Sequence, residues 1–205
     1  MLQGKVLKAQ NSFFYVDTGE RLVEAKLRGR LKKNRISIVP GDEVELELTE
    51  GGTGVIERRR ERRSLLRRPL VANIDQVVLV FAAREPDINP VLIDRFLVLA
   101  EWSKIERIIL CINKMDLLDG DEAEIPALAA LYREIGYPVC LLSTVTGEGV
   151  ADMQSLVEGK TSVFAGSSGV GKSSLLNCIA PGIALSTGAV SEKIKRGRHT
   201  TRTAQ

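Results

Sequence analysis

Apolar and polar residues follow two different patterns along the chain. Before residue 58 they come in short runs that turn residues separate, such as Pro40-Gly41-Asp42. Within residues 44–49 they alternate with a period of two, which is typical of a half-buried strand. This part of the chain predicts short strands and no helix. The expected strands are residues 5–9, 12–16, 22–27, 44–49 and 53–56.

About five strands in so short a segment indicate a small Greek-key barrel. The OB-fold is the commonest nucleic-acid-binding version of that architecture, so we expect an OB-fold-like barrel with a basic linker over residues 1–68. An SH3-like barrel is the alternative.

A different pattern begins at residue 75. Residues 77–83 form a continuous apolar run, as in a strand that is buried on both faces of a parallel sheet. Further strands are expected at 106–112, 138–142 and 162–165, and helices at 90–102, 122–135, 150–157 and 172–179. Strands that alternate with helices predict a doubly wound α/β domain over residues 69–205. On the first helix the spacing places Leu92, Phe96 and Leu99 on one face.

The composition of the chain is that of an ordinary globular protein. The chain has 205 residues, 44% hydrophobic and 27% charged, which excludes disorder along its whole length. Its apolar runs are shorter than the roughly 20 residues that span a bilayer, and its start does not look like a secretory signal. We therefore expect a cytoplasmic protein without membrane contact. Cys111, Cys140 and Cys178 lie far apart among apolar neighbours, and we expect three buried thiols with no disulfide and no zinc.

The net charge of +3 is unevenly distributed. Residues 1–68 contain 16 basic and 10 acidic side chains, whereas residues 69–205 contain 13 basic and 16 acidic ones. Seven of the basic residues are arginines between positions 58 and 68, and a further basic cluster occupies the last 13 residues. RNA phosphate would neutralise such density, so RNA is an expected partner. A solvated linker that binds nothing is the alternative.

Residues 166–173 read Gly-Ser-Ser-Gly-Val-Gly-Lys-Ser and satisfy the phosphate-loop pattern G-x-x-x-x-G-K-[ST]. A predicted strand precedes them and a predicted helix follows, as this motif requires. Glycines allow backbone N–H groups to turn inward around phosphate oxygens, and the helix N-terminus adds partial positive charge. Lys172 would reach the β- and γ-phosphates, and the Ser173 hydroxyl would bind Mg²⁺.

A second motif, Asn113-Lys114-Met115-Asp116, follows a predicted strand. A carboxylate at this position can accept hydrogen bonds from guanine N1–H and N2–H₂, whereas adenine offers no such pair of donors. Asn113 can connect the base to the phosphate loop, and the Lys114 stem can lie over the ring. Ser143 begins a Ser-Thr-Val-Thr-Gly loop that can supply backbone N–H groups to guanine O6.

The order of these motifs is unusual, because the base motif precedes the phosphate loop. A small barrel followed by this order resembles the circularly permuted GTPases of small-ribosomal-subunit biogenesis, the RsgA/YjeQ family. The resemblance extends over essentially the whole chain. It rests on residues 93–97 (Ile-Asp-Arg-Phe-Leu), 113–116, 166–173 and 197–201 (Gly-Arg-His-Thr-Thr).

The resemblance implies an OB-fold, a GTPase domain and a zinc-binding domain, with GTP hydrolysis stimulated by the small ribosomal subunit. By position, residues 197–201 look like switch I, which places Thr200 or Thr201 on Mg²⁺ and His199 near the attacking water or facing solvent. The expected catalytic residues are Lys172 and His199, and the expected Mg²⁺ ligands are Ser173 and Thr200. The expected nucleotide-binding residues are Asn113, Lys114, Asp116, Ser143, Gly166, Ser167, Ser168, Gly169, Val170, Gly171, Lys172, Ser173, Ser174, Thr200 and Thr201.

The 205 residues contain no D-x-x-G segment after the phosphate loop and no zinc site. We therefore expect an incomplete GTPase domain from a truncated or longer protein, with GTP, GDP and Mg²⁺ as ligands and a monomeric state. The leading hypothesis is a GTPase that assists late maturation of the small subunit through rRNA binding. The alternative is a guanine-nucleotide-dependent RNA-binding module without turnover. An unrelated ATPase is disfavoured by Asp116.

Overall fold

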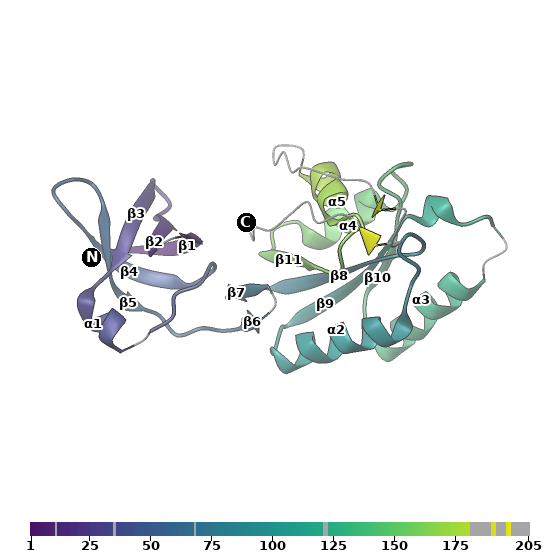
Figure 1. Ribbon diagram of the computed structural model, residues 1–205, viewed down its shortest axis with the longest axis horizontal. Coiled ribbons are helices and arrows are strands. Elements are labelled where there is room, and N and C mark those ends of the chain that lie inside the picture. The colour runs from purple at the N-terminus through teal and green to yellow at the C-terminus, as the bar shows by residue number, and fades with distance from the viewer. Residues whose placement is uncertain are drawn as a thin grey trace. The chain divides into compact units, whose positions relative to one another are not determined.

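The computed structural model describes residues 1–10, 12–34, 36–67, 69–120 and 123–180, and the backbone of residues 190–191 and 196–197. The described residues divide into two compact units, one over Met1–Ile74 and one that begins at Asp75 (Figure 1). The arginine-rich segment therefore belongs to the first unit.

The first unit is built on a closed barrel with the strand order β1-β2-β3-β5-β4, which confirms the predicted barrel. Neighbouring strands are antiparallel except β3 and β5, which run parallel. Alternate residues such as Val16, Val44 and Ile56 fill the barrel and are fully buried. The strands are β1 (Leu2–Gln10), β2 (Phe13–Asp17), β3 (Leu22–Leu27), β4 (Glu43–Leu48) and β5 (Gly54–Arg59).

Two elements of the first unit differ from the sequence prediction. A short helix α1 (Gly29–Lys33) follows β3, although no helix was expected. It has one buried residue, Leu31, so its sequence carries no helical repeat that could reveal it. An antiparallel hairpin of β6 (Leu65–Arg67) and β7 (Leu70–Ala72) follows the barrel, and its first strand lies in the arginine-rich segment that was expected to be a linker.

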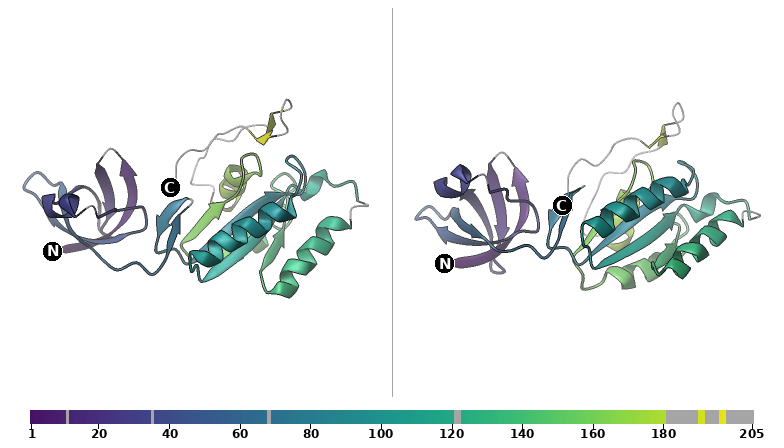
Figure 2. Two further views of the ribbon diagram at one scale, coloured as in Figure 1. Left: turned by 60° about the horizontal axis from the view of Figure 1, so that its bottom comes forward. Right: turned by 90° about the horizontal axis from the view of Figure 1, so that it is seen from below.

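The second unit contains a parallel sheet with the order β10-β9-β8-β11, as the alternating pattern predicts. Helices α2 and α3 cover one face, and α4 and α5 cover the other (Figure 2). The strands are β8 (Gln76–Ala82), β9 (Arg107–Asn113), β10 (Val139–Leu141) and β11 (Ser162–Ala165), and the helices are α2 (Pro90–Trp102), η1 (Met115–Leu117), α3 (Glu124–Ile135), α4 (Val150–Val157) and α5 (Lys172–Ile179). Two further short strands, β12 (Val190–Ser191) and β13 (Arg196–Gly197), pair antiparallel.

The face of α2 that carries Leu92, Phe96 and Leu99 is only partly buried. The helix buries Ile93, Leu97 and Ala100, whereas Leu99 is 56% exposed. Phe96 is half-buried and makes an edge-to-face contact with Phe81 of β8. Helix α2 is apolar over most of its circumference, so the spacing of apolar residues does not determine which stripe faces the sheet.

The cysteines are buried in two cases out of three. Cys111 and Cys140 lie side by side on β9 and β10, and burial raises the pKa of both thiols, that of Cys140 to about 11. Cys178, in the last turn of α5, is exposed, contrary to the prediction. None of the described helices combines the length and apolar character that crossing a membrane would require.

Candidate nucleotide site

Three loops that carry the predicted motifs follow the carboxyl ends of parallel strands. Asn113 is the last residue of β9 and residues 114–117 follow it, residues 142–149 follow β10, and residues 166–171 connect β11 to α5. Carboxyl ends of parallel strands meet at one edge of a sheet, where α/β proteins bind their ligands. Hydrogen bonds between these loops show that the three segments form one site.

The phosphate loop depends on its glycines. Gly166, Gly169 and Gly171 have φ values of +153°, +82° and +94°, a region that other residues rarely adopt. A Cβ atom on Gly166 would lie 2.1 Å from the carbonyl oxygen of Val80 on β8. The loop therefore lies directly on the sheet edge, in the backbone conformation that its motif predicts.

Asn113 connects the base motif to the phosphate loop. Its side chain is fully buried, and Nδ2 donates to the carbonyl oxygen of Val170 at 3.0 Å. Its Oδ1 accepts a hydrogen bond from the backbone N–H of Thr144 at 3.3 Å. A Cβ atom on Gly171 would lie 2.2 Å from Asn113 Nδ2, so this contact also requires glycine. One amide thus ties together all three loops.

Asp116 lies in η1 with an exposed carboxylate. The Ser143 hydroxyl donates to its Oδ1 and in turn accepts from the backbone N–H groups of Val145 and Thr146, each at 3.1 Å. The fully buried Ser143 therefore fixes both the carboxylate and the turn that follows β10. A fixed carboxylate with accessible oxygens can accept two donors from a guanine edge.

Lys114 is held at the same edge of the sheet. Its backbone is left-handed, with φ +65°, and its Nζ donates to the carbonyl oxygen of Glu85 in the loop after β8. Burial lowers the pKa of Lys114, although the negative charges of Glu85 and Asp116 act in the opposite direction. The aliphatic stem is thereby fixed at both ends.

Lys172 and Ser173 begin α5. The Lys172 Nζ donates to the carbonyl oxygens of Gly166 and Ser167, at 3.0 and 2.6 Å, and burial lowers its pKa. The Ser173 side chain is buried in the first turn of the helix. An ammonium group and a hydroxyl at a helix N-terminus suit a phosphate with its Mg²⁺. Ser168 and Ser174 are half-buried in the same loop and turn.

His199, Thr200 and Thr201 lie outside the described residues. The part of the chain that the structure describes holds no group of three or more His, Cys, Asp or Glu residues placed to bind a metal. The loop that the sequence singled out after residue 142 includes Thr144, whose backbone N–H donates to Asn113. Sequence reasoning missed two other contributors, namely Val80 and Glu85. Each acts through a backbone atom, so the residue type carries no signal of its role.

Models of two protein families match the chain. The model described as RsgA GTPase matches residues 54–205, and the RsgA N-terminal domain matches residues 3–56. Proteins named small ribosomal subunit biogenesis GTPase RsgA from Caldanaerobacter subterraneus subsp. tengcongensis and Moorella thermoacetica are 44% and 45% identical over 204 residues. The alignments cover 100% of this chain and 68% and 69% of those proteins.

Two solved structures resemble most of the chain. YjeQ from Thermotoga maritima is 40% identical with a TM-score of 0.81, and the alignment covers 90% of this chain and 67% of that one. YloQ, described as a circularly permuted GTPase, is 41% identical with a TM-score of 0.75, covering 90% and 66%. The swapped order of motifs thus occurs in a solved structure of high similarity.

Proposed function

The chain belongs to the RsgA family, whose members are named as GTPases of small-ribosomal-subunit biogenesis, and from this premise we propose its specific activity. It binds GTP at the carboxyl edge of its sheet, hydrolyses it to GDP and phosphate, and assists late maturation of the small subunit in the cytoplasm through contact with rRNA. The observation that carries the proposal is the Asn113 bridge, because it joins the base motif and the phosphate loop into one site.

Each half of the site has a separate role. Asp116, fixed by Ser143, selects guanine by accepting from N1–H and N2–H₂, and the Lys114 stem covers the ring. Backbone N–H groups of the phosphate loop and the Lys172 ammonium stabilise negative charge on the phosphates. Ser173 would hold Mg²⁺, which supplies further charge neutralisation when bound. We assign the remaining contacts, including Thr200 on Mg²⁺, Thr201 and His199, from the resemblance of residues 197–201 to switch I.

The second candidate is an RNA-binding module that depends on guanine nucleotide but does not turn over. The observation that favours it is the concentration of positive charge in residues 1–68, which belong to a different unit from the nucleotide motifs.

GTP turnover by the chain, measured with and without purified small ribosomal subunits, distinguishes the two candidates. A GTPase of this family should release phosphate faster when subunits are added. An Asp116→Asn variant is the matched control, because it should lose turnover of GTP yet keep the phosphate loop. Binding to subunits that depends on nucleotide, without any turnover, would support the module instead.

A further inference from the structure

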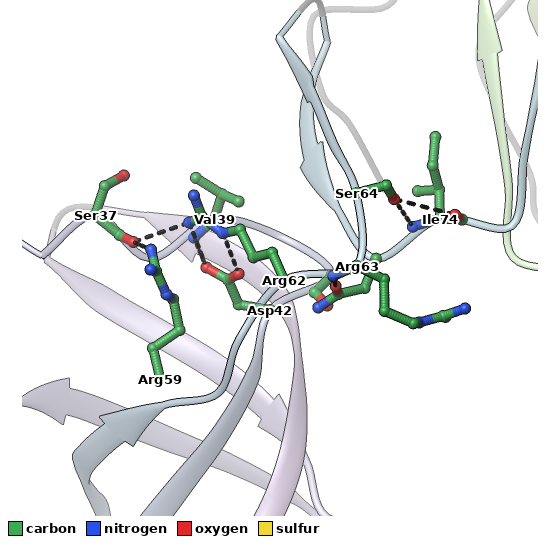
Figure 3. Close-up of polar contacts among 10 residues, drawn as sticks. Ser37, Val39, Asp42, Arg59, Arg62, Arg63, Ser64 and Ile74 are labelled. Atoms are coloured by element: carbon green, nitrogen blue, oxygen red, sulfur yellow. Dashed lines mark hydrogen bonds and ion pairs between the residues drawn. The ribbon is translucent and has the colours of Figure 1, made fainter. Parts of the chain in front are cut away.

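The arginine-rich segment is not uniformly available to a partner. Arg62 donates from Nε and Nη2 to the buried carboxylate of Asp42, at 2.7 and 2.8 Å. Arg62 and Arg59 both donate to the carbonyl oxygen of Ser37, at 2.9 and 3.1 Å (Figure 3). Arg60 lies 3.7 Å from the carboxylate of Glu43. Three of the arginines are therefore engaged within the first unit.

The segment is also attached along its length. Asn73 Nδ2 donates to the carbonyl oxygen of Gly41, and Asn73 Oδ1 accepts from the backbone N–H of Arg63. Ser64 Oγ exchanges hydrogen bonds with the backbone of Ile74 (Figure 3). The segment is thus an integral part of the first unit and not a solvated tether.

A second buried carboxylate holds two arginines that sequence reasoning did not single out. Glu57 on β5 is 4% exposed, and its two carboxylate oxygens accept from Arg28 and Arg30. Arg30 also donates to the Glu57 carbonyl oxygen at 3.2 Å. The two arginine side chains nevertheless remain 51% and 66% exposed. Their guanidinium groups are therefore fixed in position while much of each side chain faces solvent.

Arg28 immediately precedes α1 and Arg30 lies within it, and the same helix carries two exposed lysines, Lys32 and Lys33. These four residues form a basic cluster, the α1 surface. A guanidinium has five donors, so an arginine that uses one or two of them on Glu57 keeps others for a phosphate. Fixing a side chain before binding also lowers the entropy that binding costs.

We propose that the α1 surface is the phosphate-contacting surface of the first unit for rRNA, with Glu57 as its positioning residue. This inference rests on the proposed function and adds where on the barrel rRNA is bound. Net charge alone and a positioning role for Glu57 predict opposite changes in RNA affinity when Glu57 is substituted. Removing its negative charge should strengthen RNA binding if only net charge matters, and weaken it if Glu57 fixes Arg28 and Arg30.

The test measures the affinity of the whole chain for purified small subunits over a range of salt concentrations. Arg30→Ala should weaken binding about tenfold and lower the slope of log K against log salt by roughly 0.7–0.9, as the loss of one phosphate contact requires. Arg21→Ala is the matched control, since it removes the same charge from the exposed β2–β3 turn, away from α1. It should leave the slope unchanged.

Glu57→Gln should also weaken binding about tenfold, with its fold checked by thermal melting. The inference is overturned if Arg21→Ala and Arg30→Ala lower the slope equally, or if folded Glu57→Gln binds as tightly as wild type or more tightly. If Glu57→Gln does not fold, the two arginine variants decide alone, because neither removes a buried group. A wild-type chain that fails to bind subunits at all would instead refute the proposed rRNA contact.

Discussion

Gly171→Ala gives the sharpest mutational test of the contact between the two halves of the nucleotide site. The substitution adds one Cβ atom, which would lie 2.2 Å from Asn113 Nδ2. Asn113 is fully buried and hydrogen-bonded on both sides of its amide, so it cannot move away without losing a bond. Gly136→Ala is the matched control, because Gly136 also has a positive φ, +113°, but has no atom within 4 Å of the added Cβ.

Both variants place an alanine in left-handed backbone, but only Gly171→Ala also brings a Cβ atom into Asn113. An alanine in left-handed backbone costs about 1–2 kcal/mol, which both variants should show. Overlap with Asn113 adds about 1–3 kcal/mol in Gly171→Ala alone, either as overpacking or as the broken hydrogen bond to Val170. We therefore expect about 2–5 kcal/mol of lost stability for Gly171→Ala and about 1–2 kcal/mol for Gly136→Ala.

Urea unfolding without nucleotide measures both losses directly. A double-mutant cycle with Asn113→Ala then assigns the excess to one contact, because trimming the amide should remove the overlap and make the two losses less than additive. Equal losses in Gly171→Ala and Gly136→Ala, or strict additivity with Asn113→Ala, would refute the contact between Asn113 and the phosphate loop.

Four further predictions follow from the same structure. Asp116→Asn should shift nucleotide preference from guanine towards xanthine nucleotides in competition binding. An unchanged preference would show that Asp116 does not recognise the base. Tyr132→Phe should cost about 1–3 kcal/mol in urea unfolding, because the phenol donates to the carboxylate of Asp94 at 2.7 Å. Burial is the main cause, and the hydrogen bond to Asp94 the second, of a pKa of Tyr132 raised above 10.0. The wild-type protein should therefore lose its extra stability over Tyr132→Phe as the pH rises above 10. A stability difference between the two proteins that stays constant with pH would contradict this pKa shift. Asp42→Asn should cost about 3 kcal/mol or more, because it breaks a buried ion pair, and a loss below about 1 kcal/mol would show that the pair does not hold the arginine segment. At pH 8 a thiol reagent should modify Cys178 alone in the native chain and all three cysteines after unfolding; fast reaction of three would contradict the observed burial.

Most of the fold could be predicted because strands and long helices carry a strong periodic signal. The bounds of α2, α4, α5 and β11 agree with the predicted ranges. Periodicity failed where an element is a single turn, as in α1, and it does not show which stripe is buried where apolar residues surround a helix, as in α2. The exposure of Cys178 has a related cause, because apolar neighbours in sequence do not reveal which face of α5 contacts the sheet.

The sequence motifs predicted which side chains, such as Asn113, Asp116 and Lys172, come to the candidate site, and their roles in nucleotide binding stay predictions. The site could not be predicted where a backbone carbonyl oxygen acts, as at Val80 and Glu85. The arginine segment shows a further limit, since a run of like charges does not reveal which members are neutralised by distant carboxylates. Asp42 and Glu57 engage arginines 20 to 29 positions away in the sequence, and only the folded barrel brings them together.

A crystal structure of the chain with bound GDP tests the central claim most directly. One nucleotide should bridge both halves of the site, with guanine N1 and N2 within hydrogen-bond distance of the Asp116 carboxylate and the β-phosphate inside the loop of residues 166–171. The Lys172 ammonium should then contact the phosphate in place of the Gly166 and Ser167 carbonyl oxygens. A GDP molecule whose phosphate occupies that loop while its base lies away from Asp116 would contradict the account.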